Sequence, residues 1–201
     1  LYPDNLKGIR FANPMKVIKH YRSFSHQCDA TILLSHLGYE DDKEVAQNNP
    51  WLDLIIGGHT HTQLTADEPL HNGVLITQNK NKLQKATHIT LTFNNGKLKQ
   101  KTAEYIDIKS FPNKNRMVEV MVEYFSNNPM FKRVVGRTES AFKTKEELNY
   151  LMCDAFLQEG QADLSIVNNG GVRLDSLAVG DITMQDVLSM DPFYNEAVEH
   201  S

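Results

Sequence analysis

The sequence predicts an α/β fold in two parts, and three observations support the prediction. First, two short apolar runs, at 30–34 and 54–56, are each followed closely by histidine and glycine, as expected of buried strands that end in a binding loop. Second, segments between residues 74 and 107 alternate apolar and polar side chains, which is strand periodicity. Third, residues 134–201 return to a strand, helix, strand order with a second glycine-rich turn.

Composition limits the classes of protein that this chain can represent. With 201 residues and 40% hydrophobic content, it can bury one large core or two small ones. The net charge of -4 argues against a nucleic-acid scaffold, so we expect no nucleic-acid polymer as partner. No apolar run approaches the roughly 18 residues of a transmembrane helix, and the first residues lack the pattern of a signal peptide.

The first part of the chain begins with a helical pattern at 15–24, followed by the strand at 30–34 and then His36. The acidic segment that follows predicts a helix at about 43–47, with Asp41 or Asp42 as a solvated N-cap. A metal-binding role for these carboxylates is the alternative, and the sequence favours the cap.

The stretch from Asp53 to Thr62 combines a strand with a histidine loop. Leu54–Ile56 reads as a buried strand, although periodicity alone does not exclude a buried helix. Two glycines then allow a sharp turn and a close approach of the backbone. In an extended segment, His59 and His61 would face the same way and could share a metal site. The alternative, two incidental surface histidines, stays open on this pattern alone.

The middle of the chain predicts antiparallel strands and then a boundary helix. Segments 74–78, 87–93 and 97–107 alternate, and Asn94–Gly96 is a hairpin signal because Asn and Gly tolerate positive φ. Residues 111–125 predict a helix between the two parts.

The second part predicts a strand at 134–139, a long helix at 145–159 and a short strand at 163–167. Thr183 should cap a short helix that continues through Leu188. The predicted strand at 163–167 leads directly into another pair of glycines, which repeats the arrangement of the first part.

Three motifs together carry a family resemblance. They are SHLG at 35–38, GGHTHT at 57–62, and NNGGVRLDSLAVGDITMQDVLSMDPFYN at 168–195. In this order they resemble the 5'-nucleotidase family, in which a calcineurin-like metallophosphoesterase domain precedes a 5'-nucleotidase C-terminal domain.

The resemblance implies a fold and domain limits. It implies the C-terminal part of a four-layer α/β/β/α metallophosphoesterase sandwich, joined by a helix to the start of a smaller α/β nucleotide-binding domain. We expect the metallophosphoesterase part at 1–107, a linker helix at 108–133 and the substrate-binding part at 134–201.

The resemblance also implies a site with two divalent metal ions, such as zinc or manganese. His36 and His59 match ligands of one ion, and His61 matches a ligand of the other. The family draws its remaining ligands from motifs that precede these and do not occur in this sequence. We therefore expect a fragment that lacks the first metal-binding motifs, and no catalytic residue is assigned.

Substrate contacts are expected from Asn168, Arg173, Phe193 and Asn195, which match positions of the family's nucleotide site. Without the resemblance, these residues would read as an ordinary turn and an ordinary core aromatic. Relatives often carry arginine before the second part's long helix, and Arg137 is the nearest equivalent here.

The leading functional hypothesis is metal-dependent hydrolysis of nucleoside 5'-monophosphates, with an activated water attacking phosphorus in line. The alternatives are a 2',3'-cyclic-nucleotide phosphodiesterase, a nucleotide-sugar hydrolase or a non-catalytic nucleotide-binding module. The family implies a periplasmic or extracellular, cell-surface location. Base preference, metal identity and oligomeric state are not readable from the sequence.

Overall fold

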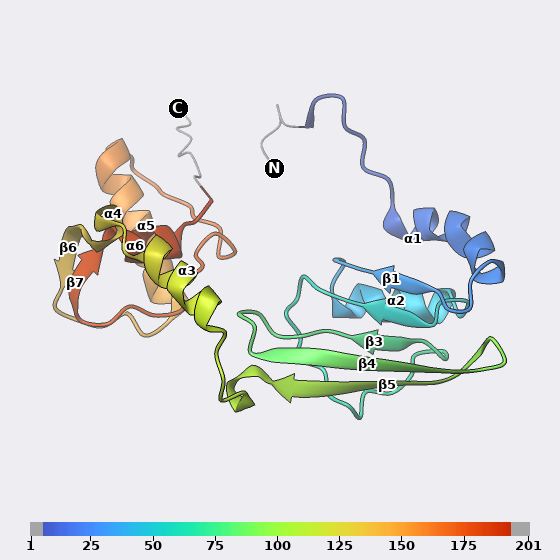
Figure 1. Ribbon diagram of the computed structural model, residues 1–201. Helices are drawn as coiled ribbons and strands as arrows, with labels where there is room; N and C mark the ends of the chain where they lie inside the picture. The colour runs from blue at the N-terminus through green and yellow to red at the C-terminus, as the bar shows by residue number, and fades with distance from the viewer. Residues whose placement is uncertain (1–5, 194–201) are drawn as a thin grey trace. The chain divides into compact units, whose positions relative to one another are not determined.

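The computed structural model describes residues 6–193 and forms two compact units, which divide the chain between residues 113 and 114. Figure 1 shows the helices and strands of the two units, and each unit has its own hydrophobic core. The division falls inside the predicted linker at 108–133, while the domain limits at 107 and 134 stay predictions. Within residues 6–193, no helix is long and apolar enough to cross a membrane.

The first unit combines a small parallel sheet with a long antiparallel hairpin. Strand β2 lies between β1 and β3, and all three strands run parallel. The elements of this unit, in chain order, are α1 (Pro14–Val17), η2 (Ile18–His26), β1 (Ile32–Leu34), α2 (Tyr39–Asn48), β2 (Leu54–Ile56), β3 (Leu75–Thr77), β4 (Lys85–Asn94), β5 (Lys97–Asp107) and η3 (Ile108–Ser110).

The core of the first unit is organised around the central strand β2. Leu54 and Ile55 are 1% and 0% exposed, which explains why a continuous apolar run stands here in place of an alternating one. Val45 of α2 and Ile76 of β3 belong to the same core cluster as Ile55. The strand reading of 54–56 is therefore confirmed, and the helix alternative is excluded.

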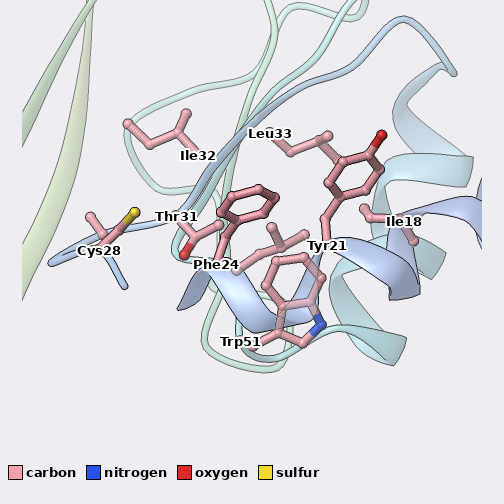
Figure 2. Close-up of a pocket in the computed structure, with 10 residues that line it drawn as sticks. Ile18, Tyr21, Phe24, Cys28, Thr31, Ile32, Leu33 and Trp51 are labelled. Carbon is pink, nitrogen blue, oxygen red and sulfur yellow. The ribbon is translucent and has the colours of Figure 1, made fainter. Parts of the chain in front are cut away.

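Strand β1 forms one edge of the parallel sheet and leaves apolar surface uncovered. Ile32 is 48% exposed and Leu34 is 77% exposed. An apolar cavity of about 470 Å³ lies beside this edge. Figure 2 shows side chains that line it, among them Tyr21, Phe24 and Trp51. None of the predicted site residues lines this cavity.

The long hairpin follows the sequence closely. β4 pairs antiparallel with β5, with one irregularity between Thr92 and Phe93. Asn95 and Gly96 connect the strands with φ angles of 49° and 73°, the left-handed conformations that favour Asn and Gly in tight hairpins. The predicted hairpin is confirmed, but the segment at 74–78, predicted among the antiparallel strands, forms β3, which is buried and pairs parallel with β2.

Two helical predictions in the first unit need correction. The segment predicted as a helix at 15–24 contains only one α-helical turn, α1, followed by the 3₁₀ helix η2. Helix α2 begins at Tyr39, earlier than predicted, and its N-cap is Gly38, whose side chain cannot cap. Asp42 therefore lies within the helix, where it is fully buried.

The second unit combines helices with a two-stranded antiparallel sheet of β6 and β7. A core cluster of Leu148, Val172, Leu177 and Met190 lies among these elements. The elements, in chain order, are α3 (Arg116–Ser126), α4 (Pro129–Lys132), β6 (Val134–Thr138), α5 (Lys145–Gly160), β7 (Gly180–Thr183) and α6 (Met184–Met190).

Capping explains where the helices of the second unit begin. Thr144 and Glu147 form a capping box at α5, and Thr183 and Asp186 form another at α6. The predicted helices at 145–159 and after Thr183 are confirmed. The boundary helix begins later than predicted, because the side chain of Asn115 caps α3.

The predicted strand at 163–167 is wrong, because this segment has no regular secondary structure. Leu164 and Ile166 are 73% and 86% exposed, and only Val167 packs against the core. Strand β7 pairs instead with β6, so 163–167 has no paired strand within the described part of the chain.

Candidate functional site

The sheet delivers two histidine segments to the same edge. The hydrogen-bond ladder continues one residue beyond the strands: Ser35 N donates to Ile56 O at 2.9 Å, and Gly57 N donates to Thr77 O at 2.7 Å. His36 and Gly58 follow directly at the carboxyl ends of β1 and β2, where parallel sheets bind ligands. The rings of His36 and His59 lie edge to face, with centroids 5.2 Å apart.

Glycine makes this close approach possible. A Cβ atom at Gly58 would lie 2.9 Å from Nδ1 of His36, closer than real Cβ contacts. At Gly38, a Cβ would lie 3.0 Å from the methyl group of Thr60. The glycines of SHLG and GGHTHT therefore let the two histidine loops pack directly on each other.

The histidine loop is bent, and the predicted extended geometry is wrong. His59 and His61 have φ angles of 75° and 53°, in the left-handed region. For residues other than glycine this conformation costs on the order of 1–3 kcal/mol each and persists only where the surroundings impose it. Extended alternation therefore does not determine the directions of these two side chains.

The histidine rings meet some of the requirements of a metal site. Neutral imidazole is a good ligand for zinc and related ions, and the adjacent rings of His36 and His59 suit one shared ion. Among residues 6–193, no three His, Cys, Asp or Glu side chains are grouped to hold an ion, so His61 is not brought into such a cluster. The assignments of His36, His59 and His61 as ligands stay predictions.

A buried polar layer lies beneath the histidine loop. Asp42 is 0% exposed and accepts a hydrogen bond from the hydroxyl of Ser35, the residue before His36. Burial raises the pKa of the Asp42 carboxyl above its ordinary value of 3.8, and the bond from Ser35 opposes that rise. The expectation of a solvated cap is thus wrong, because this carboxylate points inward.

Gln78 belongs to the same layer and was not singled out from the sequence. It follows β3 and is 2% exposed. Its Oε1 accepts hydrogen bonds from Thr60 Oγ1 at 2.9 Å and from Thr62 N at 2.7 Å. The only sequence signal was an amide residue at the end of an apolar run, which is too common to be decisive.

The turn that follows residue 167 in the second unit holds itself together. Oδ1 of Asn168 accepts from Gly170 N at 3.1 Å, and its backbone oxygen accepts from Gly171 N at 2.8 Å. The Asn168 side chain is exposed, but its oxygen already serves the turn. The contact of Asn168 with substrate stays a prediction. Such a contact would use the amide NH₂ group, because the amide oxygen is already bonded to Gly170 N.

Arg173 and Phe193 are brought together. The Arg173 guanidinium carbon lies 4.8 Å from the centroid of the Phe193 ring, a cation–π arrangement. Arg173 is exposed, and Phe193 is 50% exposed. The backbone bond from Arg173 N to Met190 O, 2.8 Å long, helps to join the turn to the end of α6.

Asn149 of α5 contacts the same turn and, like Gln78, was not singled out from the sequence. It is 6% exposed, and its Nδ2 donates to Oδ1 of Asn169. A cavity of about 470 Å³ lies here, lined by Glu146, Asn149, Tyr150, Cys153, Val167, Asn168 and Asn169.

Two further sequence expectations have simple outcomes. Asn195 lies outside the described residues. Arg137 extends from β6 to β7, where its Nη1 lies 3.2 Å from Oδ1 of Asp181 in an exposed ion pair.

Comparison with known proteins shows which family the chain resembles. Residues 125–200 match the family described as "5'-nucleotidase, C-terminal domain". The chain is 29% identical over 183 residues to the trifunctional nucleotide phosphoesterase protein YfkN of Bacillus subtilis, covering 82% of this chain and 12% of the relative. It is 30% identical over 183 residues to the uncharacterized metallophosphoesterase YunD of the same organism, covering 83% and 37%.

A solved structure shows the same fold. The 5'-nucleotidase precursor from Thermus thermophilus superposes with a TM-score of 0.73 at 20% identity, covering 90% of this chain and 42% of that one. The chain spans less than half the length of the curated relatives named above.

The chain has an α/β first unit followed by a smaller α/β unit, and its likeness to the Thermus thermophilus structure confirms the predicted fold class. The predicted resemblance to the 5'-nucleotidase family is confirmed, with residues 125–200 matching the model of its C-terminal domain.

Proposed function

We propose that the native protein hydrolyses nucleoside 5'-monophosphates to nucleoside and phosphate with the help of divalent metal ions. The observation that most supports the proposal is the contact between His36 and His59 at the carboxyl edge of the parallel sheet. Bound there, a pair of divalent ions would neutralise phosphate charge, activate water and stabilise the leaving oxygen.

The described residues can perform the binding and orienting parts of this task. His36 and His59 would offer ring nitrogens to one ion, and His61 would serve the other. The close packing of their loops through Gly58 fixes the two ring positions relative to each other, which reduces the ordering needed on binding.

Substrate recognition would fall to the second unit. Arg173 carries a permanent positive charge in a planar fork suited to a phosphate or carboxylate, and Phe193 offers an aromatic face for a base. Asn168 would contact the same substrate through its amide, and Asn195 is a further proposed contact. The nucleotide is the only partner that we propose, and a periplasmic or cell-surface location is part of the proposal.

The experiment compares single histidine variants of the native protein. His36→Ala and His59→Ala should each lose bound divalent ion and reduce AMP hydrolysis by about 100- to 1,000-fold, the range expected when a transition-state charge stabiliser is removed. His88→Ala is the matched control, because His88 is exposed on β4 and its Nδ1 lies 3.8 Å from Oε2 of the exposed Glu104.

Metal analysis after dialysis and initial rates with AMP measure the two effects. Hydrolysis that survives chelation, or full activity of His59→Ala, would refute metal-dependent catalysis at this site. Rates with a 2',3'-cyclic nucleotide and a nucleotide sugar on the same preparation separate the alternative hydrolase activities from the proposed one.

A further inference from the structure

Gln78 contacts the histidine loop on both sides of His61. Its single oxygen, Oε1, accepts from the side chain of Thr60 and from the backbone N–H of Thr62, the residues that flank this histidine. Because a backbone N–H can only donate, the oxygen of the amide must face the loop. The orientation of the Gln78 side chain is therefore fixed by the contact itself.

The other end of the same amide faces the glycine turn. A Cβ built at Gly57 would lie 3.1 Å from Gln78 Nε2 and 2.4 Å from Asp42 Oδ2. Both atoms are buried, and neither has a hydrogen-bond partner among the described residues. The Gln78 side chain thus lies between Gly57, at the start of the GGHTHT loop, and Thr60 and Thr62, at its end. The absence of a side chain at Gly57 leaves space for the Gln78 amide.

Thr60 extends this contact to the other histidine segment. Its Oγ1 donates to Gln78 and accepts from Tyr39 N at 3.2 Å, the residue that follows SHLG. Its methyl group lies against Gly38. A chain of contacts therefore runs from Gln78 through Thr60 to the segment that carries His36.

The loop needs such a restraint. His61 has a φ angle of 53°, a conformation that a histidine in a free loop would seldom keep. The two hydrogen bonds to Gln78 fix the residues on either side and so hold the backbone of His61 in this conformation.

We propose that Gln78 is the positioning residue of the histidine loop, which sets the backbone conformation of His61 and the packing of the two histidine segments before an ion binds. The inference rests on the proposed function only for the identity of the ligand, a divalent cation. Residues that orient metal ligands typically change affinity 10- to 100-fold when they are replaced.

The test uses the native protein with Gln78→Leu, a substitution that removes both polar groups at similar volume. Gln63→Leu is the matched control. The Gln63 side chain donates a hydrogen bond to Leu64 O and accepts one from Lys80 N, and it has no hydrogen bond to Thr60 or Thr62. Hydrogen exchange of the Thr62 amide and backbone chemical shifts of His61 report the loop. Zn²⁺ titration followed through the ring signals of His36 and His59 reports the cation.

Gln78→Leu should speed exchange of the Thr62 amide at least tenfold, shift the His61 signals and raise the half-saturating Zn²⁺ concentration at least tenfold. Gln63→Leu should stay within twofold of the parent chain in all three. Parent-like values for Gln78→Leu, or an equal loss in Gln63→Leu, would overturn the proposal.

A second pair of variants covers the case in which Gln78→Leu does not fold. Thr60→Val removes one of the two hydrogen bonds to Gln78, together with the bond from Tyr39 N, at nearly constant shape, and Thr60→Ser keeps the hydroxyl. Faster Thr62 exchange in Thr60→Val, restored in Thr60→Ser, supports the proposal, and identical behaviour of the two refutes it. If the parent rings do not respond to Zn²⁺, the metal part of the proposed function fails, and the exchange data still decide the role of Gln78.

Discussion

Each unit contains a paired-glycine loop with a buried amide side chain beneath it, but the two loops are held in different ways. Around Gly57 and Gly58, built Cβ atoms would meet Asp42 at 2.4 Å and His36 at 2.9 Å, both from other segments of the chain. Around Gly170 and Gly171, the nearest atoms belong to Asn168, at 3.3 and 3.1 Å. The first loop is fixed by long-range packing and the second mainly by its own turn.

This difference suits two different tasks. Metal ligands must be held within a fraction of an ångström, which requires a rigid surrounding layer. A turn that contacts a nucleotide can tolerate more adjustment, because its contacts are polar and partly exposed. The buried amides follow the same division, since Gln78 bonds to the loop on both sides of His61, whereas Asn149 reaches only Asn169.

The largest expected difference between the two glycine loops is the steric cost of an added methyl group. Gly57→Ala should destabilise the first unit by about 3 kcal/mol, because its Cβ would overlap a buried carboxylate that cannot move freely. Gly170→Ala should change stability by less than about 1 kcal/mol, since only the flexible side chain of Asn168 must shift.

Denaturant unfolding measures both variants. Trp51 is the only tryptophan in the sequence and packs against the core of the first unit, so its fluorescence reports that unit. Circular dichroism follows the whole chain and therefore includes the second. Equal destabilisation by the two substitutions would show that the loops are packed alike.

A smaller effect concerns pH and the carboxyl group beneath the first loop. The raised pKa of Asp42 in the folded state means that its contribution to stability is fully present below about pH 3.8 and is lost as the pH rises through the raised value. Asp42→Asn removes this loss. The variant should therefore gain stability relative to the parent chain as the pH rises from about 4 to 7.

At each pH, the unfolding midpoint of the parent chain is compared with that of Asp42→Asn, both followed by Trp51 fluorescence. The difference between the two midpoints removes the contribution of the other titrating groups, which both proteins share. Asp181→Asn is the control, because this exposed carboxylate lies in the second unit and pairs with Arg137 on the surface. A difference between parent and Asp42→Asn that stays constant with pH would mean that the Asp42 carboxyl titrates normally in the fold.

Much of the fold was predictable because it depends on local chemistry. The apolar run at 54–56, the Asn95–Gly96 turn and the capping threonines Thr144 and Thr183 can each be recognised within a short stretch of sequence. The strand predicted at 163–167 failed because its apolar residues find no paired strand among the described residues.

The candidate site was predictable only in part. The histidines could be named from motifs, and the rings of His36 and His59 lie in contact, but their role as metal ligands stays a prediction. The left-handed conformation of His59 and His61 and the role of Gln78 arise from packing between segments far apart in the chain. No pattern within a single segment carries that information.

We propose that the chemistry belongs to the first unit and substrate recognition to the second. The most direct measurement compares kcat/KM for AMP and for a small aryl phosphate in the native protein and its Phe193→Ala variant. Phe125→Ala is the matched control, an exposed aromatic of α3 that is 66% exposed and has no proposed contact with substrate.

Stacking of a base on an aromatic side chain is worth about 1–3 kcal/mol. Phe193→Ala should therefore lower kcat/KM for AMP by about tenfold or more, chiefly through KM, and leave the aryl phosphate within twofold of the parent. His59→Ala should lower both substrates equally. An equal loss on AMP and aryl phosphate in Phe193→Ala would contradict the division of labour, because it would assign Phe193 to the fold and not to the nucleotide.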